Sequence, residues 1–575
     1  MKFATKVINI IALVLLSVYV NGRDAIVYER EVERVYISTD RDSYIAGEKI
    51  WLSLFCFDIS GGDLKYSNLS SVGYVELHNQ DRMVATAKIS INYGRGGGFV
   101  DLPPDIPTGS YKLVAYTKYM LNEETLQLFQ RDIPIVSPLI GAKIKDKVVI
   151  VEDYYDAESN SAVESNSEFI DVLLESNVFS TNSELKLVMN NLTDIPLSLS
   201  ISVHRNDKIF SDNRQLRLEK TKDDLIKSGY SSFANRYTPE YEGEIIEGNV
   251  SFSGNPKRNP VISLAKIGEE IDLYFSEADA SGSVTFYTNG LVNSGELIIE
   301  PLYSQEIENF NIEFKDPFIN AKPSQFDSVL LSRSSLDVIE ERMFEMQVAR
   351  RYGLYNITEN VYAIRRLLNK DNLINYRLDD YNRFITIRET VFEYIPDLRF
   401  RQSGGIYSLW ALLYPDFTAY GNNKEYGTEK AMVFLDGIPI YDHTSIVEYD
   451  AYKVESIQVL AKKVYIDNHI FHGVVFINTF NGRHEDLKID PKVKIIDYNA
   501  PQSASRLSHQ HLTESNKIPD IRSLLYWDPV FDMSAKENRE ISIFTSSTAG
   551  EYCIEMEGID ENGEAIYLRR YFTVR

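Results

Sequence analysis

The chain has 575 residues, a formal net charge of −24 and 44% hydrophobic residues. A nucleic-acid-binding protein needs a basic surface, so the acidic balance argues against that class. The length allows about four domains, and the 37 tyrosines and 28 phenylalanines favour β-structure. The two cysteines, Cys56 and Cys553, exclude a disulfide scaffold, and we expect two buried free thiols.

The N-terminus has the pattern of a secretory signal peptide over residues 1–22. Lys2 and Lys6 flank the start of an apolar run over 7–20, and small residues precede a cut near Gly22. The run is shorter than the roughly 20 apolar residues that span a bilayer. The sequence therefore predicts an exported protein, periplasmic or associated with the outer membrane, with no membrane-spanning segment after cleavage.

Residues 23–137 are predicted to form a β-sandwich, with strands at 35–39, 50–55, 73–78, 83–91 and 111–116. The glycines of 94–98 are expected to form a flexible turn, because no Gly-Lys-Ser/Thr follows as in a phosphate loop. The motif Thr-Asp-Arg-Asp-Ser-Tyr at 39–44, with 47–51 and 107–113, resembles a macroglobulin domain. The reactive Cys-Gly-Glu-Gln thioester of full-length macroglobulins is absent from the sequence, so the resemblance does not imply covalent capture of proteases.

The next part of the chain contains two further predicted β units. An acidic, serine-rich linker is expected at 152–168. Strands predicted at 169–174, 185–189 and 197–203 resemble a second macroglobulin-like sandwich over 169–207, reaching as far as 240, with a long loop and a short helix over 208–240. The strand order over 241–302 is similar to the carboxypeptidase-regulatory-like sandwich.

Within residues 330–382 the apolar residues begin to recur at the spacing of a helix. We therefore predict a helical connector over this range. A helix over 336–352 is expected to begin at Ser334 or Ser335 and to end at Gly353. A second helix is predicted over 361–368. The apolar face of the first helix is expected to carry Leu336, Ile339, Met343 and Met346.

Three β-branched stretches at 430–440, 452–460 and 473–479 follow, and Asp436-Gly437 is a tight-turn dipeptide that predicts a hairpin. Together they resemble the plug domain of TonB-dependent outer-membrane receptors, in the form common in Bacteroidota, over 383–482. The chain after 482 is too short for a barrel, so the resemblance implies a freestanding module without a pore. The residues that carry the resemblance are Asp436, Gly437, Pro439, Glu455, Ile457 and Gly473.

Residues 519–575 are predicted to form a separate C-terminal β-sandwich with a hairpin turn at Asn562-Gly563. The fold class is therefore mainly β and multidomain: macroglobulin-like or immunoglobulin-like sandwiches, a small α/β plug-like module and a short helical connector. The whole domain order resembles a family of exported Bacteroidota proteins.

No residue pattern predicts catalysis, a cofactor or a metal. His469 and His472 are three residues apart, His443 and His484 flank the same module, and His509 and His511 form another cluster, but none has an acidic or cysteine partner at a telling spacing. No Gly-x-Ser-x-Gly or His-Glu-x-x-His motif occurs. We therefore expect a protein that is not an enzyme and has no cofactor.

The leading hypothesis is a non-enzymatic cell-envelope scaffold or binding subunit, which contacts an outer-membrane protein partner through sandwich faces and the plug-like module. The alternative is a carbohydrate- or peptide-binding accessory protein for outer-membrane uptake. Exposed aromatic residues such as Trp410 and Tyr414 in one concave patch would favour this alternative. The oligomeric state is left open.

Overall fold

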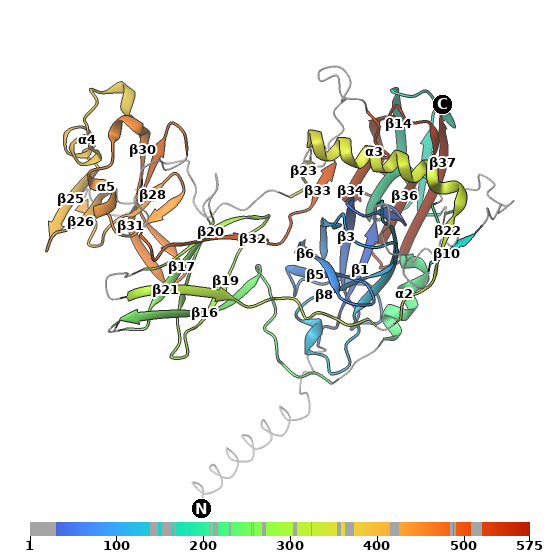
Figure 1. Cartoon of the computed structure of the whole chain (residues 1–575), viewed down its shortest axis with the longest axis horizontal. Coiled ribbons are helices and arrows are strands. Elements are labelled where there is room, and N and C mark those ends of the chain that lie inside the picture. The colour runs from blue at the N-terminus through green and yellow to red at the C-terminus, as the bar shows by residue number, and fades with distance from the viewer. Residues whose placement is uncertain are drawn as a thin grey trace, which may run out of the picture.

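The computed structural model is mainly β, with many separate sheets, as the sequence predicts (Figure 1). It describes residues 30–138, 148–151, 164–165, 168–207, 209–210, 217–228, 232–254, 256, 258–266, 272–302, 307–323, 325–353, 358–362, 373–414, 425–482, 487, 490–507 and 520–575. The predicted signal peptide and most of the predicted linker at 152–168 lie outside these ranges. Within them, no helix combines the length and apolar character needed to cross a bilayer.

The N-terminal sandwich contains every strand predicted for it. Its strand order is β1-β3-β7-β6-β5-β8-β9-β2, with β4 paired to β3. The large aromatic and β-branched side chains of these strands are buried in one core, which explains why so apolar a stretch forms a sandwich. The strands are β1 (Glu33–Thr39), β2 (Tyr44–Ile45), β3 (Lys49–Asp58), β4 (Lys65–Tyr66), β5 (Val72–His78), β6 (Met83–Asn92), β7 (Arg95–Asp101), β8 (Gly109–Tyr116) and β9 (Phe129–Val136).

The glycine run is a strand, so the prediction of a flexible turn over 94–98 is wrong. The turn itself lies at Tyr93 and Gly94, whose φ angles are 49° and 73°. A Cβ at Gly97 would lie 2.5 Å from Pro529, and one at Gly98 would lie 2.7 Å from the side chain of Gln502. The glycines therefore let β7 press against segments from the far end of the chain.

The predicted sandwiches at 169–207 and 519–575 are one domain, which corrects their assignment as separate units. β15 (Leu197–Arg205) lies between β34 (Leu524–Met533) and β36 (Gly550–Asp560), and β14 (Glu184–Asn191) pairs with β35 (Asn538–Phe544). The apolar side chains of both segments are buried in one core, so the two segments form a single sandwich. This composite sandwich also contains β11 (Glu164–Ser165), β12 (Ile170–Leu174), β13 (Val178–Phe179) and β37 (Ala565–Val574).

The small sandwich predicted at 241–302 extends beyond that range. One sheet has the order β19-β16-β21 and the other β18-β17-β20-β32. β32 (Lys494–Tyr498) pairs with β20 and comes after the plug-like stretch, so that stretch is inserted between strands of the small sandwich. The other strands are β16 (Ile245–Gly254), β17 (Val261–Lys266), β18 (Asp272–Glu277), β19 (Ser283–Tyr287), β20 (Gly295–Pro301) and β21 (Ile307–Phe314).

Helix α3 (Leu336–Tyr352) has the predicted bounds and ends at Gly353, whose φ of 68° is the left-handed stop that glycine favours. Ser335 occupies the N-cap position without a capping bond, and Leu336 is exposed whereas Arg342 is buried. Most of the second helix predicted at 361–368 lies outside the described residues. The remaining connecting elements are α2 (Leu218–Lys227), β10 (Val148–Val151), β22 (Val329–Ser332), β23 (Thr358–Asn360) and β33 (Ser505–Leu507).

The plug-like stretch forms an α/β module whose main sheet has the order β24-β30-β31-β28-β29. It is not freestanding as predicted, because Leu273, Phe275 and Ile298 of the small sandwich belong to its core. The module thus covers an apolar face of the small sandwich that would otherwise be exposed to water. The module contains β24 (Ile374–Arg377), α4 (Ile387–Tyr394), β25 (Leu398–Ser403), β26 (Ile406–Leu413), β27 (Glu425–Tyr426), β28 (Met432–Leu435), β29 (Ile438–Ile440), α5 (Thr444–Val447), β30 (Val454–Ile466) and β31 (His469–Thr479).

A buried ionic network on the 39–48 motif joins the N-terminal sandwich to α3 and the composite sandwich. The carboxylate of Asp40 accepts hydrogen bonds from Arg41 Nε and from the hydroxyl of Tyr44, at 2.8 and 2.6 Å. The guanidinium of Arg342 on α3 lies 2.5 Å from Glu48, and both side chains are at most 3% exposed. Arg41 also donates to Ser523 at 3.0 Å, so one motif binds both neighbours.

The network predicts that a buried ion pair contributes much more to the free energy of unfolding than an exposed one. Arg342→Met should lower the free energy of unfolding by about 3–5 kcal/mol, because it leaves the buried Glu48 carboxylate with only the more distant Arg41, at 3.9 Å. The matched control is Lys227→Met, which breaks an ion pair with Asp223 whose partners are 71% and 75% exposed and should cost less than about 1 kcal/mol. Urea unfolding monitored by tryptophan fluorescence measures both, and equal losses would contradict the assignment.

Candidate functional site

The motif residues Asp436 and Gly437 form the turn of the β28–β29 hairpin, as predicted. Their φ angles are 48° and 85°, which is the conformation that an Asp-Gly pair favours in a two-residue turn. The Asp436 carboxylate accepts from the amide of Thr479 at 2.7 Å and from its hydroxyl at 2.6 Å. Asp436 therefore ties the hairpin to the end of β31, which is a structural role.

Three other residues of the motif lie in the same sheet without converging on one point. Pro439 is on the edge strand β29, where a missing N–H is tolerated. Glu455 is exposed at an irregularity between β30 and β31, and Ile457 is fully buried. No shared cavity or polar cluster connects these side chains among the described residues.

Gly473 permits the closest contact between the two sheets of the module. Its φ is 96°, and a Cβ there would lie 2.4 Å from the Cβ of Ala411 on β26. Any larger residue would force β26 away from β31. The residues of the motif therefore have structural roles in the packing of the module.

The histidines of the described part are held by structural contacts. His472 Nδ1 accepts from the amide of Thr428 at 2.8 Å, and His443 Nδ1 accepts from the amide of Leu409 at 2.7 Å. The ring of His469 contacts that of Phe275 in a tilted arrangement, with 4.4 Å between the ring centroids. His484, His509 and His511 lie outside the described residues.

One other cluster brings potential metal ligands together. The ligand atoms of His204, Cys553 and Glu555 lie within 4.8 Å of one another. Glu555 is already ion-paired with Arg569 at 2.9 Å, and burial together with the Arg569 charge lowers the pKa of His204 to about 3. A cation would meet that guanidinium, so we assign the cluster to the interface with the N-terminal sandwich. Cys56 and Cys553 are both buried and free, in agreement with the sequence.

A buried acid lies where the small sandwich meets the module. Glu300 on β20 is 9% exposed, and its Oε1 has no hydrogen-bond partner. Burial, with a smaller contribution from Asp490, raises its pKa to about 8, and Lys430 of the module opposes the rise. This acid is one that sequence reasoning missed, because its spacing carries no signal.

The module has an exposed apolar end, which we call the distal patch: Tyr381, Ile385, Tyr452 and Phe480. These side chains are 38%, 68%, 54% and 52% exposed. Backbone bonds hold their segments together, since Ala451 N–H donates to the carbonyl of Ile385 at 2.9 Å and Phe480 N–H to that of Lys453 at 3.1 Å. The guanidinium of Arg383 lies 5.2 Å from the Phe480 ring.

The distal patch lies at the end of the module that is farthest from the small sandwich. The tip of the β30–β31 hairpin is seated on β18, where Asp467 accepts from the amide of Phe275 at 2.8 Å. The patch occupies the other end of this hairpin, where Val454 pairs with Thr479. Thirteen residues of β30 separate the two ends, or about 40 Å of strand.

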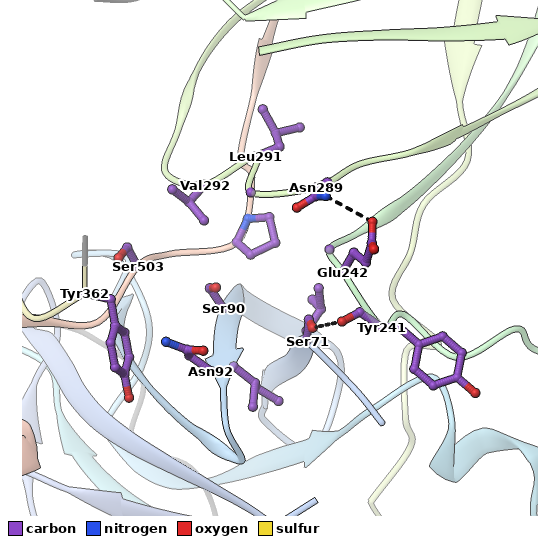
Figure 2. Close-up of a pocket in the computed structure, with 15 residues that line it drawn as sticks. Ser71, Ser90, Asn92, Tyr241, Glu242, Asn289, Leu291, Val292, Tyr362 and Ser503 are labelled. Carbon is purple, nitrogen blue, oxygen red and sulfur yellow. Dashed lines mark hydrogen bonds between the residues drawn. The ribbon is translucent and has the colours of Figure 1, made fainter. Parts of the chain in front are cut away.

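A cavity of about 350 Å³ lies between the N-terminal and small sandwiches, and we call it the interdomain cavity. Figure 2 places Ser90 and Asn92 on the N-terminal side and Glu242 and Asn289 on the small-sandwich side, with Tyr362 at one end. The amide of Asn289 donates to Glu242 at 3.0 Å. The sequence offers no pattern for this cavity, because six separate segments line it.

The aromatic residues singled out in the sequence do not form an open binding platform. Trp410 and Tyr414 are each half-buried. The guanidinium of Arg401 lies 4.2 Å from the Trp410 ring, and the hydroxyl of Tyr414 donates to Asp397 at 2.6 Å. The side chains of Trp410 and Tyr414 therefore make contacts within the module.

Comparison with known proteins gives only distant structural similarity. No protein-family model and no curated protein sequence matches the chain. Native E. coli alpha-2-macroglobulin is 9% identical, with 95% of this chain and 40% of that chain covered and a TM-score of 0.23. Salmonella alpha-2-macroglobulin reacted with methylamine is 9% identical, with 95% and 24% covered and a TM-score of 0.15. Yersinia pseudotuberculosis adhesin InvE is 9% identical, with 66% and 74% covered and a TM-score of 0.13.

The chain spans less than half the length of these macroglobulins. At such TM-scores the overall arrangements differ, so the proposals below are based on the contacts of this chain.

Gly473 provides a test of the module's packing. Gly473→Ala should lower the free energy of unfolding by about 2–4 kcal/mol, because the new methyl collides with Ala411 and the backbone is strained. Gly404→Ala is the matched control, since Gly404 also has a positive φ, 57°, but no described atom lies within 4 Å of where its new methyl would sit. Thermal unfolding by calorimetry measures both, and equal losses would show that backbone strain alone matters.

The raised pKa of Glu300 predicts a pH-dependent junction. Because the folded-state pKa is about 8 and the ordinary value is 4.5, the stabilising proton is fully held below the ordinary value and is lost as the pH rises through about 8. The free energy of unfolding should fall over this window by at most about 1.4 kcal/mol per pH unit. Glu300→Gln should remove that slope in urea titrations from pH 5 to 9.

The matched control for this pH series is Glu296→Gln, which replaces an exposed glutamate on the same strand and should leave the slope in place. An unchanged slope in Glu300→Gln would contradict the assignment.

Proposed function

We propose that this protein is a non-enzymatic scaffold or binding subunit of the cell envelope, exported and held at the outer membrane by a protein partner. The observation that carries the proposal is the distal patch, where four large apolar side chains are exposed together at the end of an inserted module. Large contiguous apolar exposure is unfavourable in water unless a partner covers it. Aromatic residues of this kind are typical anchors of protein interfaces.

The packing beneath the module supports this role. The hairpin that carries the distal patch is fixed at its tip by the small sandwich, through Asp467 and the core shared with Phe275. A rigid mounting lowers the entropy lost on binding. The module would therefore act as an arm that presents one face to an outer-membrane protein, and the plug-like resemblance is consistent with docking into a barrel supplied by another chain.

The alternative function, a carbohydrate- or peptide-binding accessory for uptake, is favoured by a different observation. The polar interdomain cavity offers a ligand site, whereas Trp410 and Tyr414 do not. The two functions are compatible, because the cavity and the distal patch are on different domains.

Point substitutions test the partner better than deletion of 383–482, because deletion would expose the core that the module shares with the small sandwich. Affinity purification of the wild-type protein from native membranes is expected to recover an outer-membrane protein. Ile385→Ser combined with Tyr452→Ser should weaken that association at least tenfold by removing two anchors. Recovery of the wild-type protein alone would overturn the proposal.

The matched control for this experiment is Tyr287→Ser, which removes a 64% exposed aromatic from the small sandwich. It should leave the association unchanged. Equal weakening by the control would show that general surface stickiness, and not the distal patch, recovers the partner.

A further inference from the structure

We propose that the interdomain cavity is a binding site for a small neutral saccharide. This goes beyond the scaffold role, because the cavity is formed by the N-terminal and small sandwiches and excludes the module. Its volume of about 350 Å³ lies at the lower end of the range of about 300–1,000 Å³ that small-molecule sites occupy.

The chemistry of the lining selects the ligand class. Carboxylate, amide and hydroxyl groups face the cavity from Glu242, Asn92, Asn289, Ser71, Ser90 and Ser503. Together they offer both donors and acceptors, which an array of sugar hydroxyls requires. An apolar ligand would displace water from this polar lining without replacing its hydrogen bonds.

Charge excludes the other small polar ligands. No lysine or arginine is among the described residues that line the cavity, and Glu242 contributes a negative charge. Phosphate and carboxylate ligands need a cation or a cluster of backbone amides, so anionic sugars and nucleotides are disfavoured. A neutral ligand whose hydroxyl groups donate hydrogen bonds to Glu242 matches the charge of this lining.

An apolar surface completes the site. The ring of Tyr362 stands at one end of the cavity (Figure 2), and burial raises its pKa to about 12, so it stays a neutral phenol. Leu291, Val292 and Pro501 add apolar lining. Sugars have apolar C–H faces as well as hydroxyl edges, and an aromatic ring beside polar groups satisfies both.

The walls are held in fixed positions. Lys88 of β6 lies 2.7 Å from Glu244, and both side chains are at most 5% exposed. The amide of Ser90 donates to the carbonyl of Gln502 at 2.8 Å, and that of Asn293 to the carbonyl of Pro501 at 2.8 Å. These bonds join the N-terminal sandwich, the small sandwich and the 501–502 segment around the cavity, so the polar groups on those segments are preorganised for a ligand.

The test uses the full chain and ligand-observed NMR with methyl glucoside, methyl galactoside, methyl mannoside, N-acetylglucosamine and maltose. At least one should bind, and glucose 6-phosphate should bind more weakly than its neutral counterpart. Asn92→Leu and Asn289→Leu should each raise the Kd at least tenfold, because each replaces an amide of the lining by an apolar group. Asn309→Leu, an exposed amide of the small sandwich outside the cavity, is the matched control and should leave the Kd unchanged.

Three results would overturn the proposal: none of the five sugars binds, the two cavity variants bind them as the wild type does, or a tetra-alanine peptide competes for the cavity at equal concentration. Unfolding midpoints of each variant separate lost binding from lost structure. The distal-patch variants should bind sugar normally, so failure of this proposal is distinguishable from failure of the partner proposal.

Discussion

The ion pair between Glu48 and Arg342 is the constraint on which the arrangement of the main body depends. Neither side chain reaches water, and each is the closest counter-charge of the other, at 2.5 Å, so breaking the pair leaves two poorly compensated buried charges. Glu48 belongs to the N-terminal sandwich and Arg342 to α3. The same ten-residue motif places Arg41 on Ser523 of the composite sandwich. Separating α3 from the N-terminal sandwich would remove the closest cation from the buried Glu48 carboxylate.

The same principle recurs at the next junction along the molecule. Lys118 and Lys88 of the N-terminal sandwich lie 2.9 Å from Glu240 and 2.7 Å from Glu244, respectively. These contacts fix the small sandwich on the N-terminal one, and the small sandwich in turn supports the module through a shared apolar core. Figure 1 shows the result, with the module at one end and the composite sandwich at the other. The interdomain cavity lies at the polar junction, and the distal patch lies at the far end of the module.

Strand and turn positions could be predicted because they depend on neighbouring residues. β-Branched and aromatic residues predict β1 and β3, which are almost wholly buried, and the backbone needs of a tight turn predict Asp436-Gly437. The stop of α3 at Gly353 follows from the left-handed conformation that glycine adopts at low cost. The glycine run at 94–98 was the exception. Its local pattern suits a turn, but the approach of Pro529 makes it a strand.

The candidate sites could not be predicted in the same way. Residues of the distal patch come from three separated segments, and those of the interdomain cavity come from six. Glu300 is one of 84 acidic residues, and only its burial beneath the module distinguishes it. Of the histidines that did stand out in the sequence, His443 and His472 accept hydrogen bonds from backbone amides and the ring of His469 contacts Phe275. His469 and His472 point to opposite faces because they are three residues apart on a strand.

The sequence by itself determined the mainly β class, the positions of most strands, the extent of α3 and the Asp436-Gly437 hairpin, because each depends on contacts within a few residues. Only the tertiary structure decided that 169–207 and 519–575 are one sandwich, that the plug-like stretch is inserted into the small sandwich, and that a cavity opens between two domains. These depend on which strand edges and apolar faces meet, and such pairings are chosen by the burial of surface and charge across the whole chain.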